Sequence, residues 1–374
     1  MTRTVLLIAG EVSGDLRAAE LVRALRARAP GVRFIGIGGD ELEAAGMEVL
    51  FHVRDMAVMG LVEVLRRYGF FRRVFRKMVE LARDARPDLV VLVDYPGFNI
   101  RFARAMKRLG IPCVYYICPQ VWAWHRSRIP ELARLVRRIL AIFPFEPEVF
   151  KGTGLRVEYV GHPLVEAARR ARAAVDDPLP WSGAPPVALL PGSRQQEVRR
   201  ILPVMIEAAE RLRERHPSAS FLVAAPSEEI AELAGGLLGN PEGVQIVSGR
   251  TGSILRQARA ALVASGTATL ETALLGCPQI VVYRTSPLTY FAARRLVRVP
   301  HIGMVNLIAG RRLCPEFVQG AARPEVLAAA LEPLLLDTPE RAAMLAGYRD
   351  VEAALGQGKA ADRAAECLIE ELGL

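Results

Sequence analysis

The chain has 374 residues, of which 51% are hydrophobic and 24% charged, and its formal net charge is +9. This composition is typical of a folded globular protein and excludes a disordered or fibrous chain, and the length predicts two domains of roughly 150 residues each. Five scattered cysteines without a CxxC pair argue against a disulfide framework and against a structural zinc site.

Buried strands alternate with helices through the first half of the chain. The first strand, residues 4–9, is shorter than the core of a signal peptide, and no stretch approaches the roughly 18–20 apolar residues of a membrane-spanning helix, so we expect a cytoplasmic protein. A helix over residues 16–28 comes next. Further strands are predicted at residues 33–37, 89–93, 113–117 and 139–142. Such a pattern indicates a parallel sheet covered on both faces, whose ligands bind beyond the carboxyl ends of the strands.

Carboxylates follow two of these strands. Asp94 precedes a turn that contains Pro and Gly, and Glu11 follows the first strand. A carboxylate at such a position can act as a general base that deprotonates a hydroxyl nucleophile. The alternative for Asp94 is turn chemistry, in which the side chain accepts hydrogen bonds from backbone amides. Asp15 lies in the same AGEVSGD segment as Glu11, and its alternative role is to cap the helix that follows it. For His125 and His162 a structural role is the simpler interpretation.

Positive charge is concentrated in two segments, residues 63–77 and 126–138. The first interleaves its bases with apolar side chains. Its candidate membrane-facing residues are Phe70, Phe71, Arg72, Arg73, Phe75 and Arg76. A basic amphipathic helix of this kind suits an anionic membrane surface. The alternative is a solvated helix whose apolar stripe faces the protein core.

A proline-rich stretch separates two similar halves. Residues 176–186 contain four prolines and no periodic pattern, which predicts a linker. The strand–loop–helix pattern then restarts, with a helix over 198–215. Strands are predicted at residues 187–190, 221–224, 244–247, 260–263 and 279–282. The predicted domains are therefore 1–175 and 187–345, with a ligand cleft between them and a helical tail over 346–374.

Two loops of the second half suit a phosphate. The segment LPGSRQQEV (190–198) follows a strand and opens a helix, where glycine lets the backbone approach an anion and the helix start attracts it. Arg194 adds a guanidinium that can hold a diphosphate. The segment is neither a Walker A loop nor GxGxxG, which disfavours NTP hydrolysis, and an ordinary turn between a strand and a helix is the alternative.

The second loop, SGTATLE (265–271), repeats this arrangement. Glu271 near the helix start can accept bonds from two ribose hydroxyls, or it can complete a capping box from Thr267 or Ala268. Two anion-binding loops in one half indicate a nucleoside diphosphate ligand. The chain lacks a GxSxG nucleophile elbow, which argues against a serine hydrolase.

An ordered set of motifs spans the chain from about residue 5 to residue 319. The set comprises AGEVSGD (9–15), MGLVEVL (59–65), VDYPGFN (93–99), YYICPQVWAW (115–124), PFE (144–146), VGHPL (160–164), LPGSRQQEV (190–198), SGTATLE (265–271), VVYR (281–284), VNLIAGR (305–311) and PEFVQ (315–319). In this order the set resembles the lipid-A-disaccharide synthases, glycosyltransferases of lipopolysaccharide assembly in Gram-negative bacteria.

The resemblance implies a fold and a reaction. The fold is α/β of the GT-B type, with two Rossmann-like domains whose parallel sheets face each other across a cleft. The reaction transfers 2,3-diacylglucosamine from UDP-2,3-diacylglucosamine to the 6-hydroxyl of 2,3-diacylglucosamine 1-phosphate (lipid X), giving the β(1→6) lipid A disaccharide 1-phosphate and UDP. Because an α-linked donor gives a β linkage, the mechanism inverts the anomeric centre and needs one base without a covalent intermediate.

The resemblance also assigns residues and partners. Asp94 is implied as the base, with Glu11 in support on the acceptor side. The UDP-sugar site is implied at Gly192, Ser193, Arg194, Ser265, Gly266, Thr267, Glu271, Asn306, Glu316 and Gln319. Neither a cofactor nor a metal is expected, since arginine and helix amides neutralise the leaving diphosphate in such enzymes. The acylated substrates imply peripheral attachment to the inner face of the cytoplasmic membrane, and the family implies a homodimer.

Two other classes of function stay open. One is a GT-B enzyme for a soluble UDP-sugar, either a transferase or a UDP-N-acetylglucosamine epimerase, which would have no need of the basic aromatic segment. The other is a basic nucleic-acid-binding protein. The sequence contains no recognised nucleic-acid-binding motif, so we expect no nucleic-acid partner.

Overall fold

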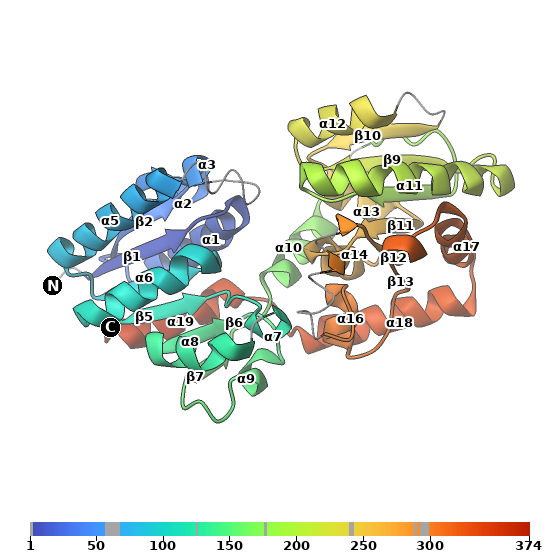
Figure 1. Cartoon of the computed structure of the whole chain (residues 1–374). Helices are drawn as coiled ribbons and strands as arrows, with labels where there is room; N and C mark the ends of the chain where they lie inside the picture. The colour runs from blue at the N-terminus through green and yellow to red at the C-terminus, as the bar shows by residue number, and fades with distance from the viewer. Residues whose placement is uncertain are drawn as a thin grey trace. The chain divides into compact units, whose positions relative to one another are not determined.

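The structure is a computed structural model that describes residues 3–56, 68–124, 126–175, 178–238, 243–287, 290–291 and 299–374. The chain forms two compact units. Unit 1 comprises Met1–Pro163 and Gly358–Leu374, and unit 2 comprises Leu164–Gln357. Each unit is built on one parallel sheet with helices on both faces (Figure 1).

Unit 1 contains a seven-stranded sheet in the order β3-β2-β1-β4-β5-β6-β7. Its strands are β1 (Thr4–Ala9), β2 (Arg33–Gly38), β3 (Glu48–His52), β4 (Leu89–Val93), β5 (Cys113–Tyr116), β6 (Arg138–Ala141) and β7 (Arg156–Tyr159). The central strand β4 is buried along its whole length, because helices cover both of its faces. Ala9 pairs with Val93 at the carboxyl end of the β1–β4 ladder, so the residues that follow leave the sheet side by side.

The helices of unit 1 form two layers. One face of the sheet packs against α5 (Tyr68–Ala85), α6 (Pro96–Leu109) and α8 (Ile129–Leu135), and the other carries α1 (Val12–Arg28) and α19 (Ala360–Leu372). Shorter helices are α2 (Asp40–Ala44), α3 (Val53–Met56), α7 (Val121–Trp124), η1 (Arg126–Arg128) and α9 (Glu146–Val149). The last helix, α19, therefore packs beside the first, although almost the whole sequence separates them.

Unit 2 contains a six-stranded sheet in the order β10-β9-β8-β11-β12-β13. Its strands are β8 (Pro186–Leu190), β9 (Ser220–Ala225), β10 (Val244–Ser248), β11 (Ala260–Ala264), β12 (Gln279–Tyr283) and β13 (Glu316–Val318). Its helices are α10 (Pro163–Ala173), α11 (Gln195–Arg215), α12 (Glu228–Leu238), α13 (Thr251–Gln257), α14 (Thr267–Leu274), α16 (Met304–Ala309), η2 (Gln319–Ala321), α17 (Pro324–Leu335) and α18 (Pro339–Ala354). Of these, α11 packs against α12 and α17, while α14, α16 and α18 pack together.

Every strand predicted from the sequence is present, with ends that differ by at most one residue. Three further strands, β3, β7 and β13, were not predicted. Each lies at an edge of its sheet and is only partly buried. An edge strand has one neighbour and an exposed side, so its sequence lacks the continuous apolar run that marks a central strand.

The compact units divide the chain at other places than the predicted domains. The predicted boundary at residue 175 and the linker 176–186 lie within unit 2, where Arg172 of α10 pairs with Glu352 of α18 at 3.0 Å. Of the predicted tail, α18 belongs to unit 2 and α19 to unit 1. Residues 176 and 177 lie outside the described part of the chain.

Candidate functional site

The predicted base lies in a strained corner at the carboxyl edge of unit 1. Asp94 and Tyr95 both have left-handed backbones, with φ of 44° and 47°. This conformation costs a residue other than glycine roughly 1–2 kcal/mol. The chain then turns directly into α6, whose first residue is Pro96. Two consecutive strained residues at a strand end mark a place where the surrounding structure imposes the geometry.

Neighbouring groups supply that constraint. The Asn99 Nδ2 donates to the carbonyl oxygens of Asp94 at 2.8 Å and of Val93 at 3.2 Å. The Tyr115 hydroxyl donates to the same Asp94 carbonyl at 2.6 Å. A Cβ on Gly10 would lie 2.3 Å from the ring of Tyr95, so position 10 must be glycine for this ring to pack here.

The environment of Asp94 makes its carboxylate more basic than usual. Burial raises the pKa of Asp94 to about 6, and the negative charge of Glu11 acts in the same direction. A hydrogen bond from the Tyr95 N–H opposes the rise. Such a carboxylate is still largely ionised at neutral pH yet accepts a proton more readily than a surface aspartate. Glu11 itself is exposed at the start of α1.

Asp15 has a structural role. Its buried carboxylate accepts hydrogen bonds from the backbone N–H groups of Gly39 at 2.6 Å, Glu41 at 3.1 Å and Leu42 at 3.3 Å. These groups lie at the start of α2, so Asp15 caps that helix although it belongs to the first turn of α1. The prediction that Asp15 caps the helix that follows it is wrong, because Asp15 lies within α1 and caps α2, a helix that only the fold brings near.

A second buried carboxylate, Glu146, was not singled out from the sequence. It accepts hydrogen bonds from Trp122 Nε1 and from the N–H groups of Ile142 and Phe143, each at 3.1 Å. Burial raises the pKa of Glu146 to about 7 against these bonds. The sequence signal for Glu146 was the PFE motif (144–146), which is one member of the ordered set of motifs and gave no separate role to this residue. Glu146 ties the loop after β6 to the CPQVWAW segment.

The two histidines have different outcomes. His162 is buried, and its ring lies 5.2 Å from that of Phe143. Burial lowers the pKa of His162 to about 3, so the ring is neutral at physiological pH. This placement agrees with the structural interpretation. His125 lies outside the described residues.

In unit 2, the first predicted phosphate loop follows β8. Gly192 has φ of 116°, and a Cβ there would lie 2.7 Å from the Glu197 carboxylate, so the position favours glycine. Ser193 and Arg194 are exposed just before α11. The Arg194 guanidinium is 67% exposed and pairs with Glu197 at 3.1 Å. An exposed pair of this kind is weak, so the guanidinium is available to a stronger anion.

The second loop leads from β11 into α14. The N-cap residue is Gly266, with φ of 150°, and no described atom lies within 4 Å of a Cβ built on it. Because this N-cap has no side chain, the capping-box alternative for Glu271 is wrong; Glu271 lies half-buried one turn into the helix. Thr267 is the first helical residue. The Ser265 hydroxyl donates to the Ile302 carbonyl at 2.8 Å and so fixes a neighbouring loop.

Asn306 and Glu316 support that loop from its other side. Asn306 is fully buried: its Nδ2 donates to the Cys314 carbonyl and to Glu316, and its Oδ1 accepts from the N–H groups of Leu313 and Cys314, all at 2.8 Å. Glu316 accepts from the N–H groups of Gly303 at 2.9 Å and Ile302 at 3.1 Å. This geometry gives Asn306 a supporting role in place of the implied contact with UDP, because such a contact would break bonds inside the protein.

Gln319 lines a cavity at the ends of β12 and β13. Its Oε1 accepts from the Thr285 N–H at 2.9 Å and its Nε2 donates to the Thr285 carbonyl at 3.0 Å. The cavity has a volume of about 380 Å³ and is lined by Arg200, Arg284, Thr285, Pro287, Gln319 and Gly320. Neither arginine forms an ion pair with a carboxylate of the described residues. Two guanidinium groups without acidic partners favour an anionic ligand.

The basic segment of unit 1 is described from residue 68 onward. In α5, Arg72, Arg73 and Arg76 are exposed, whereas Phe70, Phe71 and Phe75 pack partly buried against the core. The Phe75 ring lies 5.5 Å from that of Phe98. The phenylalanines therefore follow the alternative of an apolar stripe that faces the core, while the arginines face outward. Arg66, Arg67 and the MGLVEVL segment lie outside the described residues.

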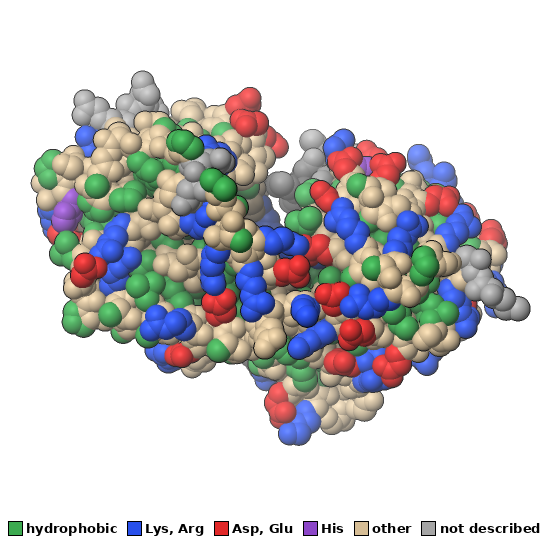
Figure 2. All heavy atoms as spheres, turned by 180° about the vertical axis from the view of Figure 1, so that it is seen from behind, with side chains coloured by type: hydrophobic (Ala, Val, Ile, Leu, Met, Phe, Trp, Pro, Cys, Tyr) green, Lys and Arg blue, Asp and Glu red, His purple; other side chains and the backbone are tan. Residues whose placement is uncertain are grey.

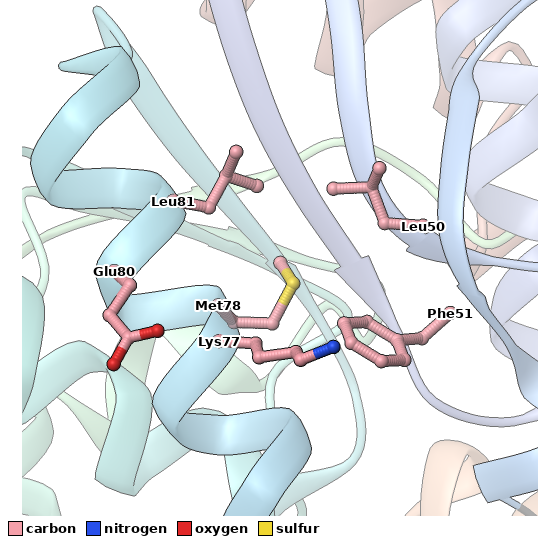
Figure 3. A pocket seen from close by; sticks show the side chains of 6 residues that line it. All are labelled: Leu50, Phe51, Lys77, Met78, Glu80 and Leu81. Atoms are coloured by element: carbon pink, nitrogen blue, oxygen red, sulfur yellow. The ribbon is translucent and has the colours of Figure 1, made fainter.

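The surface shows where basic and apolar groups gather. On the face drawn in Figure 2, Lys and Arg side chains are interspersed with Asp and Glu, and this face has no continuous basic surface among its described residues. A second cavity of about 380 Å³ lies between α5 and the edge strand β3 (Figure 3). Its lining is mainly apolar and comprises Leu50, Phe51, Lys77, Met78, Glu80 and Leu81. Among the described residues, no helix is long and apolar enough to cross a bilayer, and no three potential metal ligands lie together.

Comparison with known proteins identifies the relatives of this chain. The family model described as lipid-A-disaccharide synthetase matches residues 5–371. The lipid-A-disaccharide synthase of Myxococcus xanthus (strain DK1622) is 42% identical over an alignment of 377 residues. The alignment covers 98% of this chain and 97% of the relative. The lipid-A-disaccharide synthase of Geobacter sulfurreducens is 39% identical over 374 residues, with 99% and 97% covered.

Solved structures share the fold at low sequence identity. A putative UDP-N-acetylglucosamine 2-epimerase from Listeria monocytogenes superposes with a TM-score of 0.65 at 16% identity, covering 99% of this chain and 95% of the other. The glycotransferase of kitacinnamycin superposes with a TM-score of 0.64 at 19% identity, covering 99% of this chain and 100% of the other. Together with the two parallel sheets, these matches establish the GT-B type of fold.

Proposed function

The chain belongs to the lipid-A-disaccharide synthase family, and on that premise we propose that it is an inverting glycosyltransferase which makes the β(1→6) lipid A disaccharide 1-phosphate. The donor is UDP-2,3-diacylglucosamine, the acceptor is 2,3-diacylglucosamine 1-phosphate, and the second product is UDP. The family match over residues 5–371 carries this proposal. The half-buried carboxylate of Asp94 would supply the base that the reaction requires.

Unit 1 provides the base. The acceptor's 6-hydroxyl oxygen forms a bond to the anomeric carbon while its proton passes to the Asp94 carboxylate. The bond between that carbon and the UDP oxygen breaks, and its electron pair leaves with the diphosphate. A single displacement inverts the configuration, so the scheme has no covalent enzyme intermediate. The charge of Glu11 assists by keeping Asp94 basic.

Unit 2 holds the leaving group. Gly192, Ser193 and Arg194 would contact the diphosphate, and the turn of Ser265, Gly266 and Thr267 would present the amides at the start of α14 to it. Glu271 would accept bonds from the ribose hydroxyls. Arg200 and Arg284 add two cations at the neighbouring cavity, which the neutral amide of Gln319 also lines. Arginine and helix amides stabilise the charge that develops on departing UDP.

Peripheral membrane association forms part of the proposal. Both substrates carry acyl chains, and α5 exposes Arg72, Arg73, Arg76 and Lys77. An anionic bilayer attracts clustered arginine and lysine side chains, and each contributes about 1 kcal/mol to the free energy of membrane binding. Attachment to the inner face of the cytoplasmic membrane and a homodimer both stay predictions.

Acceptor-dependent release of UDP tests the function. Purified protein is incubated with UDP-2,3-diacylglucosamine, with and without 2,3-diacylglucosamine 1-phosphate, and UDP and the disaccharide are quantified. We expect both products in equal amounts only when the acceptor is present. Conversion of UDP-N-acetylglucosamine to its 2-epimer, with no disaccharide from the acylated pair, would support the epimerase alternative instead.

A further inference from the structure

Two buried hydrogen-bond donors meet on one backbone oxygen at Asp94. The Tyr115 hydroxyl lies 2.6 Å and the Asn99 Nδ2 lies 2.8 Å from the Asp94 carbonyl oxygen. Neither residue takes part in the proton transfer described above. A carbonyl oxygen has two lone pairs, so these two donors use its full capacity.

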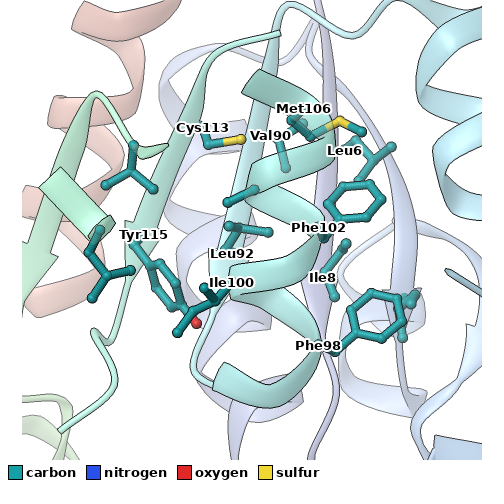
Figure 4. Packing of buried hydrophobic residues seen from close by; sticks show 14 of the residues in the cluster. Leu6, Ile8, Val90, Leu92, Phe98, Ile100, Phe102, Met106, Cys113 and Tyr115 are labelled. Carbon is teal, nitrogen blue, oxygen red and sulfur yellow. The ribbon is translucent and has the colours of Figure 1, made fainter. Parts of the chain in front are cut away.

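The donors come from different elements. Tyr115 belongs to β5, next to β4, and lies on the face of the sheet that α6 covers (Figure 4). Asn99 belongs to the first turn of α6. Both side chains are buried, with no exposed area. Loss of either bond would leave a buried polar group unpaired, so the bonds do not exchange readily with water.

These bonds act on the part of the chain that aims the carboxylate. Fixing the carbonyl direction fixes the peptide plane between Asp94 and Tyr95, the two residues with left-handed backbones. The ordinary extended conformation is favoured by roughly 1–2 kcal/mol per residue, so an unrestrained corner would relax. Relaxation would turn the Asp94 side chain away, and a misplacement of about 1 Å can cost on the order of 100-fold in rate.

We propose that Tyr115 and Asn99 are positioning residues for the catalytic base. By holding the Asp94 carbonyl from both sides, they keep the backbone left-handed and the carboxylate directed at the acceptor hydroxyl. The inference rests on the proposed function, in which Asp94 takes that proton. Burial keeps the pKa of Tyr115 well above its ordinary value, so its hydroxyl stays a donor across the working pH range.

The adjacent tyrosine provides a matched control. Tyr116 is equally buried on the same strand, points to the opposite face, and its hydroxyl has no hydrogen-bond partner among the described residues. We expect Tyr115→Phe to lower kcat by about tenfold or more. The KM for acceptor and the Kd for UDP should stay unchanged. The acid limb of the pH profile should move to lower pH, because a relaxed corner exposes the Asp94 carboxyl to water. Tyr116→Phe should retain both the kcat and the pH profile of the wild type.

A second variant keeps the test decisive. Asn99→Ala should resemble Tyr115→Phe, and the double variant should lose less than the product of the two single losses, because both donors act on one oxygen. The inference is overturned if Tyr115→Phe keeps the wild-type pH profile, even with a lowered melting temperature, or if the two losses multiply. Activity in Asp94→Asn would instead overturn the proposed base. If Asp94→Asn is inactive while Tyr115→Phe is unaffected, the positioning role is overturned and the proposed base stands.

Discussion

Asp94 differs from a surface aspartate in its backbone and in its acidity. Since its pKa is raised to about 6, we expect kcat/KM to fall as the pH drops through about 6, because the protonated carboxyl accepts no proton. A pH–rate profile of UDP release between pH 5 and 8 measures this. Glu11→Gln should move the acid limb to lower pH, since the Glu11 charge raises the pKa of Asp94. A flat profile would contradict the role of Asp94 as base.

Replacement of the same residue separates chemistry from stability. Asp94→Asn should abolish turnover while UDP affinity persists, because the residues proposed to bind UDP lie in unit 2. Because the pKa of Asp94 is higher in the folded protein, the folded state binds more protons than the unfolded chain between about pH 4 and 6. The ionised Asp94 carboxylate therefore destabilises the native state at pH 7. The amide should therefore raise the free energy of unfolding by about 1–2 kcal/mol at pH 7. Calorimetry at pH 7 and pH 4 checks this, and a loss of stability at pH 7 would contradict it.

Arg194 should act mainly on binding. A hydrogen bond to a charged group contributes about 1.5–3 kcal/mol, so Arg194→Ala should weaken UDP binding roughly 10- to 100-fold in titration calorimetry. Arg199 is exposed on the same helix, and Arg199→Ala serves as the control that should bind UDP like the wild type. Equal losses in both variants would point to general electrostatics instead of a specific contact.

The candidate site residues predicted from the sequence share a local signal. Asp94 stands directly after an apolar run, and Gly192 and Arg194 follow another within four residues, so a strand end can be recognised from a few neighbouring residues. Asn99 and Tyr115 carry no such signal, because their role depends on contact with a segment that only the fold brings near.

The role of Asn306 in supporting a loop likewise could not be predicted from its neighbours in the sequence. Asn306 was implied as a UDP contact, yet its four hydrogen bonds go to Leu313, Cys314 and Glu316. Whether an amide faces a ligand or braces a loop is decided by burial, and burial of a single polar residue is not encoded in its neighbours along the chain.

At the level of elements, every central strand was predictable, whereas of the four edge strands only β10 was predicted. The central strand β4 is an uninterrupted apolar run, whereas β7 (RVEY) mixes charged and apolar residues because one side has no neighbouring strand. Helix α5 shows a related limit. Its amphipathic pattern was clear, but the pattern alone did not reveal that Phe75 packs against Phe98.

The outward face of α5 provides a test of membrane binding. Replacement of Arg72, Arg73 and Arg76 by Gln should weaken sedimentation with anionic vesicles by roughly 100-fold, at about 1 kcal/mol per residue. Added salt should weaken binding of the wild type in the same way. The charge-matched control replaces Arg23 and Arg28 of α1 and Arg33 of β2, which are exposed in the same unit outside α5, and should bind nearly normally. Binding that ignores salt and anionic lipid would contradict the proposal.

At the level of the whole chain, unit 1 depends on residues from both ends of the sequence. Leu368 of α19 is fully buried, and the helix packs on α1. Leu368→Ala should lower the free energy of unfolding of unit 1 by about 2–5 kcal/mol. UDP affinity should persist, because the residues proposed to bind UDP lie in unit 2. Glu366→Gln, at an exposed position on the same helix, should change stability by less than about 0.5 kcal/mol. Loss of UDP binding in Leu368→Ala would show that the units are not independent.

The return of α19 to unit 1 also governs the order of events on the ribosome. Domains usually fold in the order in which they are synthesised. Here α1 is synthesised before unit 2 and its partner α19 after unit 2, so this pair can pack only once unit 2 has been made. Unit 2 is continuous in the chain and can fold earlier, so a nascent chain would hold a finished unit 2 while the sheet of unit 1 still lacks one of its covering helices.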